Sequence, residues 1–118
     1  MAIKELNRKR RGHAFYPPKA VAKKIPALGK TDGEGDDAVV HLHYFSGAAD
    51  WYITELDVES GMSFGWAEMF PGGGEWGYTD LVEVEAVNTG LVVIERDLHW
   101  EPKPMRTALA DRVMHLYH

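Results

Sequence analysis

The stretch AVVHLHYFSGAADWYITELDV, residues 38–58, carries the clearest strand signals of this chain. Along residues 38–45, Leu42 and Tyr44 fall on one side of an extended chain and His41 and His43 on the other, and residues 51–58 are also typical of a strand. The residues between them, SGAAD, are typical of a turn, so the chain is able to reverse there. Residues 38–45 and 51–58 are therefore predicted to form an antiparallel hairpin.

More strands are expected on either side of this hairpin. The sequence ESG turns the chain into a strand over residues 62–69, which ends at the glycine-rich loop 71–75. A further strand is predicted over residues 91–99, where LVVIERDLH follows a turn. One face of the resulting sheet should be apolar. The residues predicted to be buried in it are Val40, Leu42, Leu56, Ile94 and Leu98.

Helices are expected at three places. Pro18 and Pro26 bracket residues 19–25, which have apolar residues one helical turn apart. Asp80 and Glu83 have the spacing of a capping box for a short helix, although LVEVEAV also alternates as a strand would. After Pro104, apolar residues recur at helical spacing and predict an amphipathic helix. They are Met105, Leu109, Val113 and Leu116.

Together these elements predict an α+β protein of one domain. Its antiparallel sheet should have about four to five strands, with a short N-terminal helix and a C-terminal amphipathic helix. A chain of 118 residues is long enough for one core and too short for two. The absence of cysteine excludes disulfides, thiolate zinc sites and cysteine nucleophiles. No apolar run approaches the roughly 20 residues that span a bilayer, so we expect a cytoplasmic protein without a membrane partner.

Charge is distributed unevenly along the chain. Residues 1–30 hold nine Lys and Arg against one acid, a net charge of +8, whereas residues 31–118 hold four against 17, a net charge of -13. We therefore expect a flexible basic arm over residues 1–18 and a folded domain over residues 19–118. A basic arm favours a nucleic-acid partner, because Lys and Arg make most phosphate contacts. Alternatively, it folds back on the acidic body or stays solvated.

If the arm binds nucleic acid, five cations are the candidate contacts, and deleting residues 1–16 should leave the fold intact because they lack core periodicity. The partner would be nucleic acid or a protein complex that processes it. The candidate binding residues are Arg8, Lys9, Arg10, Arg11 and Lys19.

Three of the predicted strands also offer ligands for a divalent metal. If the strands were neighbours in register, polar side chains from one side of each would converge, and a bound metal would activate water for hydrolysis. A solvated sheet face is polar at alternate positions too, and we expect no tightly bound cofactor. The candidate ligands are His41, His43, Glu55, Asp57, Glu95, Asp97 and His99.

Four segments carry a resemblance to a known family. They are WYITELD (51–57), FGW (64–66), EWGY (75–78) and IERDLHWEPKP (94–104). In content and order they resemble the bacterial family catalogued as domain of unknown function 2958. The resemblance implies a small bacterial protein of a kind often carried by plasmids, integrated elements and phages, and it transfers no activity or catalytic residue. The basic N-terminus and the helix after Pro104 depart from that pattern.

Two classes of function remain open. The first is a non-enzymatic interaction protein of a mobile element or phage, which acts on nucleic-acid machinery through its basic arm or its acidic surface. DNA carries about one charge per 1.7 Å, so an acidic body could imitate it and occupy a restriction or CRISPR complex as an anti-defence protein. The second class is a metal-dependent hydrolase. The first class requires fewer features to coincide than a metal site built from three strands does. The sequence contains no GxSxG, HExxH, HxE…CxxC or kinase-like motif.

Overall fold

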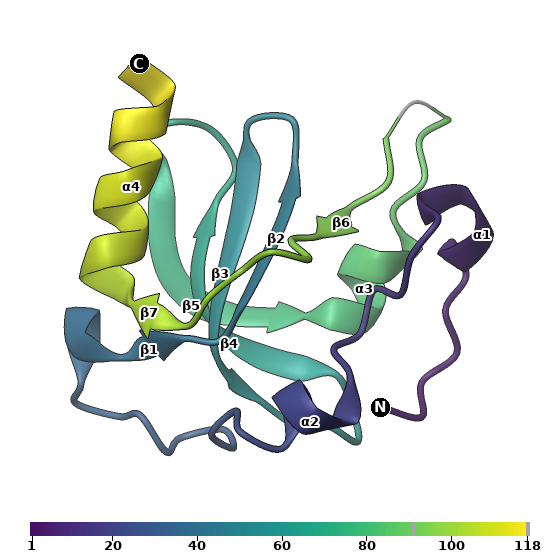
Figure 1. The fold of residues 1–118 in the computed structure, drawn as a ribbon, viewed down its shortest axis with the longest axis horizontal. Helices are drawn as coiled ribbons and strands as arrows, with labels where there is room; N and C mark the ends of the chain where they lie inside the picture. Colours follow the sequence, from purple (N-terminus) through teal and green to yellow (C-terminus); the bar gives the residue numbers. More distant parts are fainter. Residues whose placement is uncertain (91, 118) are drawn as a thin grey trace.

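Five antiparallel strands in the order β5-β4-β3-β2-β6 form the main sheet of the computed structural model (Figure 1). The structure describes residues 1–90 and 92–117, with side chains through Met114. The α+β class, the single domain and the antiparallel sheet are confirmed. The strands are β2 (Leu42–Ser46), β3 (Ala49–Leu56), β4 (Met62–Glu68), β5 (Gly74–Asp80) and β6 (Glu95–Arg96).

Strand β3 is the centre of the sheet and is buried along nearly its whole length. Its alternating side chains enter two apolar clusters, because successive residues of a strand point to opposite faces. Trp51 and Ile53 belong to the cluster that we call the N-terminal face, where Phe15, Leu81 and Ile94 cover the sheet. Tyr52 belongs to the opposite cluster, the α4 face, which is covered by Met105 and Ala108 of the C-terminal helix.

Helices form at the three predicted places, with changes in length, whereas α1 and the turn η1 were not predicted. Asp80 caps α3 by accepting a hydrogen bond from the backbone N–H of Val82 at 3.0 Å, which confirms the helix interpretation of LVEVEAV. Helix α2 ends at Ala22 rather than near Ile25. The helices are α1 (Arg8–Arg11), α2 (Lys19–Ala22), α3 (Leu81–Ala86), α4 (Met105–Tyr117) and the 3₁₀ turn η1 (Gly35–Asp37).

The buried stripe of α4 differs from the predicted one. Met105 and Leu109 face the sheet as expected, but the side chain of Val113 is 54% exposed. Beyond Leu109, the contact with the sheet is made by Arg112, which forms ion pairs with Asp50 and Glu68. Arg112, which was not part of the predicted apolar stripe, therefore attaches the second half of the helix to the sheet. The prediction for Leu116 lies outside the described side chains.

The predicted strand over residues 38–45 is broken at His41. Strand β1 (Val39–Val40) pairs with β7 (Lys103–Pro104) in a separate two-stranded sheet, and β2 begins at Leu42. The backbone N–H of His41 still donates to the carbonyl of Ile53 at 2.9 Å, so the chain stays beside β3 through the break.

Strand β5 was not predicted, because the glycine-rich sequence was interpreted as the end of the meander. The loop is in fact a tight turn, in which the N–H of Gly73 donates to the carbonyl of Phe70 at 2.9 Å. The next residue begins β5, which pairs with β4 from Gly74 opposite Glu68 to Asp80 opposite Met62.

The strand predicted over residues 91–99 is much shorter than expected. Among residues 92–99, only Glu95 and Arg96 pair with β2, and an isolated bridge joins Asn88 to Val93. The prediction for Leu91 lies outside the described residues. The chain then turns at Asp97, whose side chain accepts a hydrogen bond from the N–H of His99 at 3.0 Å. Leu98 is consequently 53% exposed, and the prediction that it is buried was wrong. The other four residues predicted to be buried are in the core: Val40, Leu42, Leu56 and Ile94.

A β-bulge at Thr54 determines which side chains reach the α4 face. Tyr52 is paired with Trp66, but after the bulge Glu55, not Thr54, is paired with Phe64. Paired residues of antiparallel strands share a face, so the bulge places Glu55 beside the aromatic side chains of β4. In regular alternation, Glu55 would point to the N-terminal face instead.

Among residues 1–90 and 92–117, no helix combines the length and the apolar character needed to cross a membrane.

Candidate functional site

The β4–β5 hairpin carries four aromatic side chains on the α4 face. They form two cross-strand pairs, Phe64 opposite Tyr78 and Trp66 opposite Trp76. The ring of Phe64 stacks on Trp76 with centroids 5.8 Å apart and meets Tyr78 edge-on at 5.1 Å. Trp66 meets Trp76 edge-on at 5.8 Å, so the four rings support one another.

Only part of this aromatic group is covered by the C-terminal helix. Trp66 and Trp76 pack against the cluster of Met105 and Ala108, whereas Tyr78 at the other end is 67% exposed. The Trp66 side chain lies close to Gly74 of the neighbouring strand, where only a residue without a side chain leaves room for it. A Cβ at Gly74 would lie 2.1 Å from Nε1 of Trp66.

An acidic loop lies above the uncovered part. Residues 31–37, with the sequence TDGEGDD, contain four carboxylates in seven positions. One end of the loop is fixed by the side chain of Glu55, which is 1% exposed. Glu55 accepts hydrogen bonds from the N–H of Gly29 at 2.7 Å, from the N–H of Thr31 at 2.9 Å and from the Thr31 hydroxyl.

The surroundings of Glu55 stabilise its charged form. Burial raises the pKa of Glu55, but the hydrogen bonds donated by Thr31 and Gly29 outweigh burial and hold that pKa below its ordinary value. The other end of the loop is fixed by an ion pair between Arg106 of α4 and Asp37 of η1. The loop is therefore tied to the sheet at one end and to a helix at the other.

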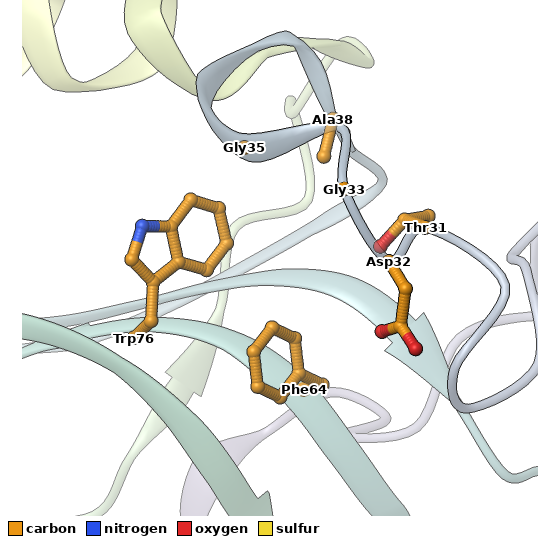
Figure 2. Close-up of a pocket in the computed structure, with 7 residues that line it drawn as sticks. All are labelled: Thr31, Asp32, Gly33, Gly35, Ala38, Phe64 and Trp76. Carbon is orange, nitrogen blue, oxygen red and sulfur yellow. The ribbon is translucent and has the colours of Figure 1, made fainter.

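A pocket of about 330 Å³ separates the loop from the aromatic side chains (Figure 2). Figure 2 shows the rings of Phe64 and Trp76 projecting from the two strands toward the loop. The opposite wall is short side chains and backbone, with the carboxylate of Asp32 at its edge. The lining residues are Thr31, Asp32, Gly33, Gly35, Ala38, Phe64 and Trp76.

The electrostatic character of the pocket is negative. No lysine or arginine lines it, and Lys30 is the only cation in the sequence between Gly29 and Ala38. In the part of the chain that the structure describes, ion pairs reach Asp37 but not Asp32, Glu34 or Asp36. An aromatic floor beneath unpaired carboxylates attracts cations and repels phosphate.

The seven predicted metal ligands do not form one cluster. Glu55 is occupied in the loop anchor, and Asp57 accepts hydrogen bonds from Ser60 and from the N–H of Glu59 in the next turn. His41 lies at the break between β1 and β2, and burial lowers its pKa. In the described part of the chain, no three His, Asp or Glu side chains are arranged so that they could hold a metal ion.

Of the seven, the structure joins His43 and Asp97 by a hydrogen bond. Nδ1 of His43 lies 3.0 Å from the Asp97 carboxylate, and Nε2 lies 2.6 Å from Asp50, a residue that the sequence did not single out. Burial lowers the pKa of His43, while Asp97 acts in the opposite direction. Asp50 also pairs with Arg112 of α4, so this group ties the helix to the sheet. A pocket of about 420 Å³ adjoins it.

The remaining candidates, Glu95 and His99, lie with Asp97 around a smaller pocket of about 230 Å³. The carboxylate of Glu95 is 3.6 Å from the ring of His13. His99 is exposed beyond the turn at Asp97.

The basic arm lies against the body, which is one of the two alternatives considered for it. Arg11 is buried and pairs with Glu85 of α3 at 3.0 Å and with Glu5 at 3.2 Å. Its Nε also donates to the carbonyl of Ile94 at 2.6 Å. The side chain of Arg10 donates to Asn88 and to the carbonyl of Gly90. Of the five candidates, Arg8, Lys9 and Lys19 are exposed and have no ion pair in the described part of the chain.

Sequence reasoning missed the residues that build the aromatic pocket. Neither residues 31–37 nor the tryptophans were among the predicted site residues. The signal that was present is the pairing of two aromatic alternations, F-x-W in residues 64–66 and W-x-Y in residues 76–78, across a glycine turn. That signal becomes readable only when the second segment is recognised as a strand.

Comparison with protein-family models supports the resemblance noted from the sequence. A model described as "Protein of unknown function (DUF2958)" matches residues 19–114. The match includes most of α4, so the expectation that this helix departs from the family pattern was wrong. Residues 1–18 lie outside the match, as expected for the basic N-terminus. Comparison with curated proteins and with solved structures gave no significant match.

Proposed function

This chain belongs to the DUF2958 family, whose description records no activity, and we propose from the chain's own surface that it is a non-enzymatic interaction protein. It binds the basic surface of a protein that handles nucleic acid, and it does so through the acidic loop of residues 31–37. The observation that carries this proposal is the anchored loop, which presents exposed carboxylates beside an aromatic pocket.

The arrangement of the arm supports the acidic surface over the basic one. Arg11 is neutralised within the molecule by Glu5 and Glu85, and Arg10 is occupied at residues 88–90. A phosphate would have to displace these contacts to use either cation. The loop carboxylates Asp32, Glu34 and Asp36 need no such rearrangement, because they are exposed.

A protein with this surface would compete with nucleic acid for a positively charged channel. Phosphate contacts dominate the affinity of nucleic-acid-binding proteins, so an acidic competitor at the same cations would displace DNA in a salt-dependent way. We propose that the partner is a cytoplasmic nucleic-acid-processing complex, such as the restriction or CRISPR complexes that act against phages and mobile elements.

The test is a competition assay in which a restriction or CRISPR complex bound to labelled DNA is titrated with the protein at two salt concentrations. Wild type should displace DNA, more weakly at high salt. A loop variant with Asp32→Asn, Glu34→Gln and Asp36→Asn should lose most of this effect. A matched control removes three exposed acids elsewhere, with Glu59→Gln, Glu83→Gln and Glu101→Gln. Equal loss in both variants would show that only net charge matters and would contradict the proposal.

Direct nucleic-acid binding by the arm is the second candidate, because Arg8, Lys9 and Lys19 are exposed. The same assay separates the two candidates when the protein is added to free DNA. Binding of DNA that disappears on changing Arg8, Lys9 and Lys19 to Gln would favour the arm. Displacement without direct DNA binding would favour the acidic loop.

A further inference from the structure

We propose that the pocket between Phe64, Trp76 and the acidic loop receives a single arginine side chain of the partner protein. This inference rests on the proposed function and assigns a ligand group to the same site. The pocket of about 330 Å³ has an aromatic floor and a carboxylate at its edge, and these are the two groups that a guanidinium uses.

The floor is suited to a flat cation. The planes of the Phe64 and Trp76 rings differ by 12°, so a flat group that is parallel to one ring is nearly parallel to the other. Guanidinium is planar and weakly hydrated, and it stacks on such faces, whereas the ammonium of lysine is a compact and strongly hydrated charge. The negative face of the indole ring adds a favourable electrostatic contribution when the cation is partly desolvated.

The edge of the pocket supplies the counter-charge. Asp32 lines the pocket and is free of ion pairs among the described residues, so its carboxylate can accept hydrogen bonds from a guanidinium. A nucleobase would stack on the same rings, but its phosphates would then approach Asp32, Glu34 and Asp36. Charge therefore favours an arginine over a nucleotide.

The pocket is already formed before a ligand arrives. Hydrogen bonds to Glu55 hold the loop at Thr31, and the ion pair of Asp37 with Arg106 holds it at η1. Trp66 meets Trp76 edge-on and fixes the ring that forms the floor. A pocket held in this way loses little conformational entropy when a side chain enters.

The test uses short glycine-serine peptides that carry one arginine, one lysine or one citrulline, which is the uncharged analogue of arginine. Binding is followed by tryptophan fluorescence at low salt. We expect the arginine peptide to bind about tenfold more tightly than the citrulline peptide, a difference of about 1.4 kcal/mol. Asp32→Asn should abolish most of this preference. Trp76→Leu should remove the fluorescence change, whereas Trp100→Leu, outside the pocket, should leave it.

The outcomes distinguish this inference from the proposed function. If all three peptides bind equally, or if Asp32→Asn changes nothing, the arginine pocket is refuted. Equal affinity for the lysine and arginine peptides also refutes it, because the aromatic rings would then contribute no preference beyond the attraction of opposite charges. If the inference fails while the loop variant still loses competition with DNA, the acidic surface acts without the pocket. If Trp76→Leu does not fold, Asp32→Asn and the citrulline peptide decide the matter.

Discussion

At the scale of single residues, two buried tyrosines on the N-terminal face provide a matched comparison. The hydroxyl of Tyr44 donates to the carbonyl of Phe15 at 2.9 Å, whereas the hydroxyl of Tyr16 is buried without a hydrogen-bond partner in the described part of the chain. Burial, with nearby carboxylates, raises the pKa of Tyr16 to about 12. An unpaired buried hydroxyl costs desolvation without any compensating bond.

We therefore predict opposite effects for the two hydroxyl deletions. Tyr44→Phe should lower the free energy of unfolding by about 0.5–1.5 kcal/mol, and Tyr16→Phe should leave it unchanged or raise it. Urea unfolding of both variants at pH 7 measures the difference. A clear loss of stability in Tyr16→Phe, equal to that in Tyr44→Phe, would mean that the Tyr16 hydroxyl has a partner in solution.

Gly65 and Gly77 are paired across β4 and β5 but have different surroundings. A Cβ at Gly65 would lie 1.9 Å from the carbonyl oxygen of Tyr52, next to the bulge, whereas a Cβ at Gly77 would meet nothing within 4 Å. Gly65→Ala should cost about 1–3 kcal/mol or more, because the backbone atom it meets cannot rotate away. Gly77→Ala should leave the free energy of unfolding unchanged or raise it slightly. A Gly→Ala change at an unstrained position typically adds about 0.4–1 kcal/mol of stability. Similar melting temperatures for the two variants would contradict the register described for this hairpin.

At the scale of elements, the anchor between Glu55 and the acidic loop makes stability depend on pH. The folded-state pKa of Glu55 lies below its ordinary value of 4.5, so folding favours the ionised carboxylate. The resulting stabilisation is complete above pH 4.5 and is lost as the pH falls through the lower folded-state pKa.

Glu55→Gln removes this anchor and places an amide NH₂ against the donors of Gly29 and Thr31. We expect it to cost about 1–3 kcal/mol at pH 7, and the difference from wild type should shrink steadily below pH 4.5. Unfolding curves at a series of pH values from 7 to 3 measure this convergence. A difference that stays constant across the series would show that the charge on Glu55 is not what the loop requires.

Elements with a local signal could be predicted from the sequence. The hairpin of β2 and β3, the cap of α3 and the start of α4 each follow from residues adjacent in the chain. The pairing of β1 with β7 joins residues 39–40 to 103–104, and no local pattern encodes such a contact. The bulge at Thr54 was also invisible, because it depends on the fit of β3 against β4.

The candidate site shows the same limit. Glu55 was named only as a candidate metal ligand, and its role as a loop anchor depends on a face that the bulge reassigns. Neither Trp76 nor Asp32 was a predicted site residue. Nothing in the sequence shows that Asp32 and Trp76 line one pocket, because the two residues are more than forty positions apart in the chain.

At the scale of the whole molecule, the N-terminal segment is part of the folded body in this structure. Phe15 is fully buried in the core cluster of the N-terminal face, and Arg11 pairs with the buried carboxylate of Glu85. The structure thus leads us to expect that deleting residues 1–16 destabilises the fold, contrary to the expectation from periodicity. An aromatic anchor and one buried ion pair do not need periodicity to hold a segment.

A single substitution tests this attachment more cleanly than a deletion. Arg11→Ala leaves Glu85 buried with its charge uncompensated and should cost about 3 kcal/mol. Lys9→Ala, two residues away and exposed, should change stability by less than about 0.5 kcal/mol. Thermal unfolding of the two variants gives the comparison. Near-equal stability would indicate that the segment detaches in solution and that the flexible-arm interpretation is correct.

We propose that the acidic loop with its aromatic pocket, and not the basic arm, is the surface of the molecule that meets a partner. The most direct measurement is a residue-resolved NMR titration of the labelled protein with an arginine-rich peptide. We expect the amide shifts to concentrate in residues 31–37 and in the hairpin of β4 and β5, including the indole N–H of Trp76. Shifts that spread evenly over all acidic residues, or that leave residues 31–37 and Trp76 unchanged, would contradict it.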